Sequence, residues 1–171
     1  MKFSHLFSAL TATLIASAAM ASGDHAGGHA DLDAIGKPGK AVNAKRIIAV
    51  DMMDTMRFTP SSITVKQGET IKFVVKNSGK VKHELVLGTE NELKEHNEVM
   101  KKNPEMEHAD ENMVTVAPGK TGEIIWQFTK AGQVNFACLQ PGHFDAGMKG
   151  AVTVAGGKMP PAKDGHGDHK H

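Results

Sequence analysis

Residues 138–148 read Cys-Leu-Gln-Pro-Gly-His-Phe-Asp-Ala-Gly-Met and have the spacing C-x4-H-x4-M. They follow directly on residues 133–137, which have the pattern of a short strand. Pro141-Gly142 and Ala146-Gly147 permit tight reversals between the three spaced side chains. A thiolate, an imidazole and a thioether can therefore converge on one ion, and soft sulfur combined with imidazole is the donor mixture that selects copper.

Cys138 is the only cysteine among the 171 residues, so no disulfide can form within the chain. A lone cysteine is often a buried, inert thiol that packs as a small hydrophobic side chain. The neighbours of Cys138 favour a metal ligand instead, because His143 and Met148 lie on the same loop.

A copper site of this kind is built from two histidines, a cysteine and an axial methionine at a long bond distance. The loop supplies only one of the two histidines. His83 is the predicted second histidine, because it opens the expected strand 83–87 after a turn that begins at Asn77. His96 and His108 are the alternatives, and both lie in a charged segment away from a strand end. The predicted ligands of one copper ion per chain are His83, Cys138, His143 and Met148.

Short stretches rich in β-branched and aromatic residues recur between turn signals along the chain. Ile71, Phe73 and Val75 alternate with a second set that includes Lys72 and Lys76, as in a strand with one buried face. Regular short strands of this kind predict an all-β fold, a β-sandwich or a barrel. The expected strands are 46–50, 62–65, 70–76, 83–87, 112–116, 122–128, 133–137 and 150–154.

The spacing of apolar residues changes between residues 90 and 102. Leu93, His96 and Met100 recur there at helical intervals within a charged background. Asn103-Pro104 is a stop signal for a helix. The sequence therefore predicts a short helical insertion in the sandwich.

The ends of the chain differ in composition from its middle. Residues 1–21 combine Lys2, an apolar run and Ala19-Met20-Ala21, which predicts a signal peptide cleaved after residue 21. The apolar run is short for a membrane span, so we expect an exported, periplasmic mature chain without membrane insertion. The other expected segments are a flexible His-containing arm at 22–44, a folded domain at 45–155 and a flexible His-rich tail at 156–171.

The charge balance of the chain argues against two kinds of partner. Removing residues 1–21 takes away one of the 20 basic residues and none of the 19 acidic ones, so the two totals become equal. Binding to nucleic acid or to an anionic membrane requires a clustered excess of basic residues. Neither is expected as a partner, and no Gly-rich phosphate loop is present in the sequence.

Taken together, these stretches resemble the cupredoxins, the type 1 or blue copper proteins. The similarity rests on Gly68-Glu69-Thr70, Asn77-Ser78-Gly79, His83, Thr121-Gly122-Glu123 before Trp126-Gln127-Phe128, Gly132 before Phe136-Ala137-Cys138, and the C-x4-H-x4-M loop. It covers roughly residues 45–155 and is strongest to the periplasmic cupredoxins associated with copper tolerance.

The resemblance implies an eight-stranded Greek-key β-sandwich with copper at one end and electron transfer between Cu(I) and Cu(II). It further implies that His83 and His143 are equatorial nitrogen ligands, that Cys138 is the equatorial thiolate and that Met148 is the weak axial ligand. Glu84 departs from the family, in which an asparagine commonly follows the first histidine and hydrogen-bonds across to the cysteine loop.

Two functions fit these features. The first is single-electron transfer or copper handling in copper tolerance, with a transient redox or copper-handling protein that docks on apolar residues beside His143, namely Phe144, Ala146, Gly147 and Met148. The second is a copper scavenger or metallochaperone, because 10 His and 10 Met could hold weaker accessory copper. A single cysteine and a single domain argue against a multicopper enzyme.

Overall fold

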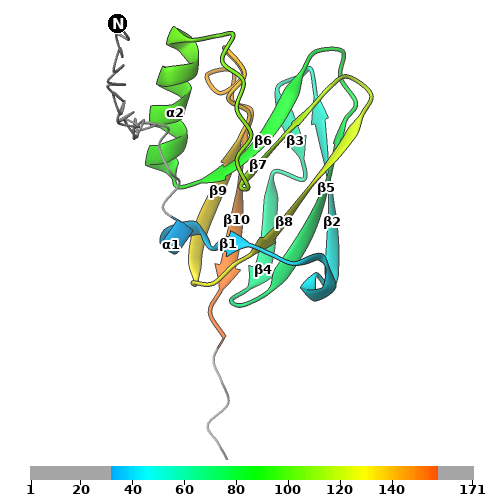
Figure 1. Cartoon of the computed structure of the whole chain (residues 1–171), viewed down its shortest axis with the longest axis vertical. Coiled ribbons are helices and arrows are strands. Elements are labelled where there is room, and N and C mark those ends of the chain that lie inside the picture. The colour runs from blue at the N-terminus through cyan, green and yellow to red at the C-terminus, as the bar shows by residue number, and fades with distance from the viewer. Residues whose placement is uncertain (1–31, 158–171) are drawn as a thin grey trace, which may run out of the picture.

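The computed structural model describes residues 32–157, in which two five-stranded sheets pack face to face (Figure 1). The strands are β1 (Lys37–Pro38), β2 (Arg46–Met53), β3 (Arg57–Thr59), β4 (Ser62–Lys66), β5 (Thr70–Asn77), β6 (His83–Gly88), β7 (Met113–Val116), β8 (Thr121–Gln127), β9 (Gly132–Ala137) and β10 (Lys149–Ala155). The helices are α1 (Leu32–Ile35), a 3-10 turn (Ala41–Asn43) and α2 (Glu90–Lys102).

The strand order is β1-β8-β5-β2-β3 in one sheet and β4-β10-β9-β6-β7 in the other. The pairs β2/β5 and β4/β10 are parallel, and the other pairs are antiparallel. All eight expected strands occur, with β1 and β3 as short additions. The predicted Greek-key β-sandwich with a helical insertion is confirmed.

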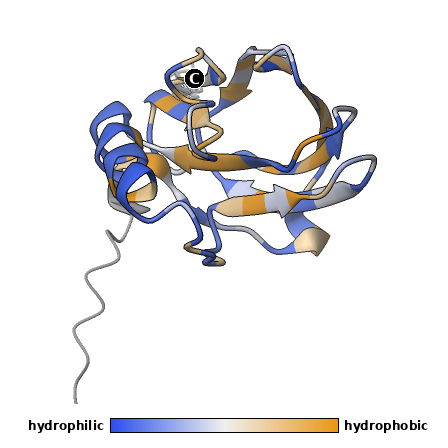
Figure 2. Ribbon diagram, turned by 90° about the horizontal axis from the view of Figure 1, so that it is seen from above, coloured by the Kyte–Doolittle hydropathy of each residue, from blue (hydrophilic) through white to orange (hydrophobic). Residues whose placement is uncertain are grey.

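The core lies between the sheets, where alternate residues of each strand meet. Ile71, Phe73 and Val75 of β5 are buried, as their alternation predicts. Phe73 meets Phe128 edge to face with ring centroids 6.2 Å apart, an arrangement that aromatic rings favour. Figure 2 shows the two sheets end-on, with apolar stretches along the strands and the mainly polar α2 to one side.

Helix α2 covers the outer face of the second sheet. Thr89 and Glu92 form a capping box at its start, which satisfies backbone donors that the first turn leaves unpaired. Leu93 and Met100 are buried in one cluster with Val86 of β6. Strand β6 is therefore covered on both faces, and all six of its residues are buried.

Within the described part of the chain, no helix is long and apolar enough to cross a membrane.

Part of the expected flexible arm is folded onto the sandwich. Strand β1 pairs with β8, and Ile35 of α1 is 1% exposed in the main core. The Trp126 indole N–H donates to the Ile35 carbonyl oxygen at 2.8 Å. Residues 32–44, which the sequence assigns to the flexible arm, therefore contact the sandwich through the Ile35 side chain, the hydrogen bond from Trp126 and the pairing of β1 with β8, although the segment shows no periodicity. The expected signal peptide, residues 22–31 of the arm and residues 158–171 of the tail lie outside the described residues.

Replacing Ile35 by alanine is expected to destabilise the domain by about 2–5 kcal/mol, because it leaves a cavity in the main core cluster, to which Trp126 also belongs. Urea unfolding followed by the fluorescence of this single tryptophan measures the change. The control is Val42→Ala in the same segment, which is 85% exposed and should change the stability by less than about 0.5 kcal/mol. Equal stability of the two variants would contradict the packing of this segment.

Candidate metal centre

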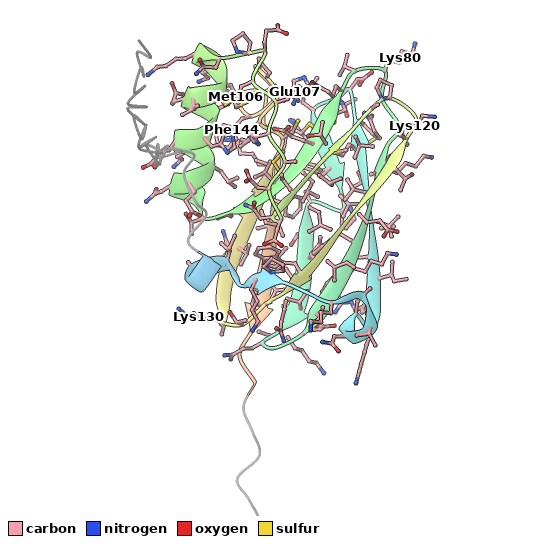
Figure 3. The ribbon with its side chains drawn as sticks, in the orientation of Figure 1. Lys80, Met106, Glu107, Lys120, Lys130 and Phe144 are labelled. Atoms are coloured by element: carbon pink, nitrogen blue, oxygen red, sulfur yellow. The ribbon has the colours of Figure 1, made fainter. Side chains whose placement is uncertain are left out.

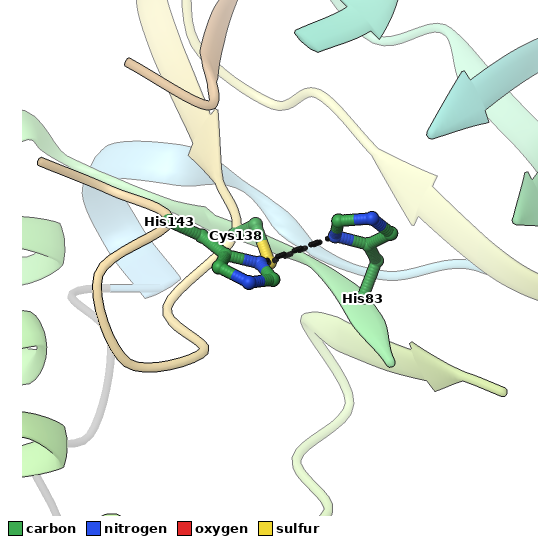
Figure 4. Close-up of side chains that lie close together, drawn as sticks. All are labelled: His83, Cys138 and His143. Carbon is green, nitrogen blue, oxygen red and sulfur yellow. Dashed lines mark hydrogen bonds between the residues drawn. The ribbon is translucent and has the colours of Figure 1, made fainter. Parts of the chain in front are cut away.

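Three donor side chains from distant parts of the chain converge at one end of the sandwich (Figure 4). His83 opens β6, whereas Cys138 and His143 lie on the loop between β9 and β10. The Nδ1 atoms of His83 and His143 are 3.1 Å apart, and Cys138 Sγ lies 3.2 Å from Nδ1 of His143 and 3.9 Å from Nδ1 of His83. Because metal–nitrogen bonds are about 2.0–2.1 Å long, donors this close can share one ion. A thiolate with two imidazoles fits copper.

The backbone of the loop doubles back on itself. The Cys138 N–H donates to the Met148 carbonyl oxygen at 3.1 Å, and the Met148 N–H donates to the His143 carbonyl oxygen at 3.0 Å. Met148 is fully buried and packs in the same core cluster as Cys138. The fourth predicted ligand therefore comes from a residue that the loop brings directly beside the cysteine backbone.

Two glycines and one arginine shape this loop. Gly142 and Gly147 have φ angles of 83° and 92°, in the left-handed region that favours glycine. The Arg57 guanidinium donates from Nη1 to the Ala146 carbonyl oxygen at 3.0 Å and lies against Gly147. The glycines could be read from the sequence. The contribution of Arg57 could not, since it lies 89 residues away along the chain.

Asp54 orients the upstream histidine. Its Oδ1 atom lies 3.1 Å from Nε2 of His83. A carboxylate that accepts the Nε2–H leaves Nδ1 of His83 as the nitrogen directed at Cys138. The backbone N–H of Lys80 is the main cause that lowers the pKa of Asp54, and the hydrogen bond with His83 adds to it. No motif in the sequence marks Asp54, which acts through the tertiary fold alone.

Glu84 ties β6 to the cysteine loop at the position where the family commonly has asparagine. Its side chain is buried and accepts hydrogen bonds from the Leu139 backbone N–H at 3.0 Å and from the Gln140 amide at 2.9 Å. Its own backbone N–H donates to Cys138 Sγ at 3.4 Å. A bridge between the segments that carry His83 and Cys138 is thus present, with a carboxylate in place of an amide.

Burial controls the protonation of the sulfur and imidazole donors. Desolvation raises the pKa of the Cys138 thiol to about 12, although backbone N–H groups of Glu84 and Gln140 oppose the shift. Desolvation and, to a smaller degree, the charge of His83 lower the pKa of His143. In the ion-free chain the thiol is therefore protonated at neutral pH, and metal binding must release its proton.

Exposure separates the two imidazoles. His83 is fully buried, whereas His143 is half-buried and has an edge at the surface. The expected apolar patch around His143 is smaller than predicted, because Phe144 is 7% exposed and Met148 is fully buried. Phe144 packs instead against α2, and the Lys149 ammonium group lies 3.9 Å from its ring centroid.

The alternative ligands lie elsewhere. His96 and His108 contact each other, with their Nε2 atoms 2.7 Å apart, and are not part of the group formed by His83, Cys138 and His143. The competing assignments for the upstream histidine therefore do not share this centre.

Comparison with known proteins agrees with a copper site in a cupredoxin fold. Residues 44–155 match the family of copper binding proteins of the plastocyanin/azurin type. The chain is 56% identical over 132 residues to the copper-resistant cuproprotein CopI of Rubrivivax gelatinosus, which covers 76% of this chain and 80% of the relative. It is 39% identical over 150 residues to the copper-resistant cuproprotein CopI of Pseudomonas aeruginosa, which covers 71% and 82% of the two chains.

Solved structures agree in fold. An auracyanin of Roseiflexus castenholzii superposes with a TM-score of 0.56 at 25% identity, over 66% of this chain and 98% of that one. An azurin of Methylomonas sp. strain J gives a TM-score of 0.52 at 18% identity, over 66% and 99% of the two chains, and supports the fold alone. On the match over residues 44–155 and the identity to the two cuproproteins, the chain belongs to the plastocyanin/azurin family of copper-binding proteins.

Proposed function

We propose that this chain is an exported type 1 copper protein that transfers single electrons through one copper ion held by His83, Cys138, His143 and Met148, and that it serves copper tolerance. The convergence of the first three side chains to within 4.8 Å of one another carries the proposal. The backbone hydrogen bond between Cys138 and Met148 supports the fourth ligand.

The contacts that hold these donor side chains in place suit electron transfer. Copper bound here would supply a Cu(I)/Cu(II) couple. Asp54 holds the His83 ring, Arg57 holds the loop, and Glu84 links the loop to β6, so the donors keep their places whatever the charge of the site. Donors that do not move between two charge states keep the reorganisation small.

The two faces of the site differ in their access to solvent. Cys138, Met148 and His83 are fully buried, so the interior side of the site excludes water. His143 alone among the proposed ligands has an edge at the surface, beside the exposed Pro141, Gly142 and Ala146. A redox partner would therefore dock over this edge of His143.

Export and copper tolerance are supported from two sides. The amino-terminal sequence has the form of a signal peptide. The relatives from Rubrivivax gelatinosus and Pseudomonas aeruginosa are described as copper-resistant cuproproteins. A periplasmic cupredoxin that acts on copper or on a redox partner during copper stress fits both observations.

Serine at position 138 is expected to abolish the strong thiolate-to-copper charge-transfer band in the visible spectrum, because the hydroxyl does not replace the sulfur donor. Titration with Cu(II) under non-reducing conditions should show this band saturating at one equivalent in the unaltered chain and absent in Cys138→Ser. His108→Gln serves as the control and should keep the band. A band of full intensity in His83→Ala would contradict the proposed ligand set.

Glu84→Gln is expected to raise the reduction potential by roughly 40–90 mV, equivalent to about 1–2 kcal/mol of charge–charge interaction, because it removes a buried negative charge that favours Cu(II). Spectroelectrochemical titration of the visible band measures the shift. Glu123→Gln is the control, since its half-exposed side chain is screened by solvent. An unchanged potential in Glu84→Gln would show that the bridge to Leu139 and Gln140 does not tune the site.

A growth assay for copper tolerance distinguishes electron transfer at the proposed centre from copper scavenging by the ends of the chain. A copper-sensitive host that produces the Cys138→Ser variant is expected to lose protection, whereas a chain without residues 22–31 and 158–171 should retain it. The deletion spares residues 32–44, since Ile35 belongs to the core. Growth is measured over a range of copper concentrations. Loss of protection in the deletion variant, with an unchanged visible spectrum, would favour scavenging by His25, His29, His166, His169 and His171.

A further inference from the structure

We propose a second copper site, one that takes Cu(I), formed by His96 of α2 and His108 of the segment between α2 and β7, with methionine thioethers beside them. It lies apart from the proposed type 1 centre and does not depend on the ligands of that centre. Three observations on the described residues carry it.

The first observation is the geometry of the pair. The Nε2 atoms of His96 and His108 are 2.7 Å apart, and the ring centroids are 4.6 Å apart with an interplanar angle of 45°. The pair at the type 1 centre, His83 and His143, has nitrogens 3.1 Å apart, centroids 4.8 Å apart and an angle of 51°. Two pairs of imidazoles thus present converging nitrogens in nearly the same arrangement.

The second observation concerns the remaining nitrogen of His108. Its Nδ1 atom lies 3.5 Å from Asp110 Oδ2 and 3.1 Å from Met113 Sδ, both of which can only accept a hydrogen bond. The proton of neutral His108 is therefore held on Nδ1, and Nε2 is left with a lone pair directed at His96. A carboxylate behind a ligating histidine is a common partner at metal sites; Asp110 occupies that place behind His108 at 3.5 Å, as Asp54 does more closely behind His83 at 3.1 Å.

The protonation of His96 is compatible with ligation. Burial, and next the charge of His108, lower the pKa of His96, so its ring is neutral at neutral pH. Neutral imidazole is the form that binds metals. Without an ion, the close contact is a hydrogen bond from His96 to His108 that a bound cation would replace.

The third observation identifies the metal. Met100 and Met106 line one pocket of about 130 Å³ together with His108 and with Met113, whose sulfur lies on the Nδ1 side of the His108 ring. Neutral thioether sulfur favours the soft ion Cu(I), imidazole also suits copper, and hard divalent ions such as Mg²⁺ and Ca²⁺ prefer oxygen donors. Met100 is 2% exposed and Met106 is 41% exposed, so the pocket offers thioethers both at the surface and inside. Figure 3 shows Met106 near α2, at the end of the sandwich where the Phe144 label also lies.

The same pocket leads toward the type 1 centre. Glu84 and Gln140 line it, and their side chains are joined by the hydrogen bond at the base of the cysteine loop. His108 and the hydrogen bond between Glu84 and Gln140 therefore border one pocket. This position suits a site that acquires copper for the centre or stores it beside the centre.

Competition for Cu(I) against a chromophoric chelator under anaerobic conditions tests the proposal on the full exported chain. The unaltered chain should retain one equivalent more than the His96→Gln/His108→Gln variant. The His-rich ends are the same in both chains, so the difference counts this site alone. Glu95→Gln, an exposed neighbour on α2, is the matched control and should retain the full amount.

Two further measurements keep the test independent of folding. Asp110→Asn retains both imidazoles and is expected to weaken Cu(I) binding at this site about 10–100-fold. In the unaltered chain, Ag⁺ used as a diamagnetic substitute for Cu(I) should shift the Nε2 resonances of His96 and His108 in imidazole nitrogen spectra. Equal retention of Cu(I) by the unaltered and double-variant chains, or Nε2 resonances that Ag⁺ leaves in place, overturns the proposal.

The visible spectrum distinguishes this site from the type 1 centre. The double variant should keep the charge-transfer band of Cys138 with Cu(II), whereas Cys138→Ser should lose the band and keep the Cu(I) equivalent at His96 and His108. Loss of that equivalent in Cys138→Ser would show that the extra copper belongs to the type 1 centre and would also overturn the second site.

Discussion

The antiparallel pairing of β6 with β9 positions the candidate metal centre. The contacts around that centre depend on this pairing. Val86 lies opposite Ala137, so the start of β6 and the end of β9 come together at one end of the sandwich. This register places His83 beside Cys138, although 55 residues separate them in the chain. A slip of one residue would turn the His83 side chain to the opposite face of the sheet, where α2 packs.

Burial on both faces of β6 makes its register costly to change. Leu85 and Leu87 face the core between the sheets, whereas Val86 faces α2. The carboxylate of Glu84 is buried on the α2 side and needs its donors on the cysteine loop, because an unpaired buried charge is strongly unfavourable. The hydrogen bonds that satisfy Glu84 are therefore the same contacts that fix the loop.

The two proposed copper sites differ in their sulfur donors. The proposed type 1 centre would combine imidazoles with the thiolate of Cys138, whose proton must leave on binding because burial raises the pKa of the thiol. The pair of His96 and His108 is accompanied by thioethers, which carry no proton and suit Cu(I). The helical insertion covers the outer face of β6 and carries His96, which contacts His108.

The sequence by itself predicted the sandwich, the helix over residues 90–102 and the spacing of Cys138, His143 and Met148, because these depend on periodicity and on short-range turns. It also indicated His83, through its place at the start of a strand. Only the tertiary structure could reveal the roles of Asp54 and Arg57, the anchoring of Ile35 and the contact of His96 with His108. Each of those contacts joins residues that are distant in the chain or that lie in segments without a regular pattern. The packing of the two sheets and α2 decides which of these residues touch, so no local pattern in the sequence predicts the contacts.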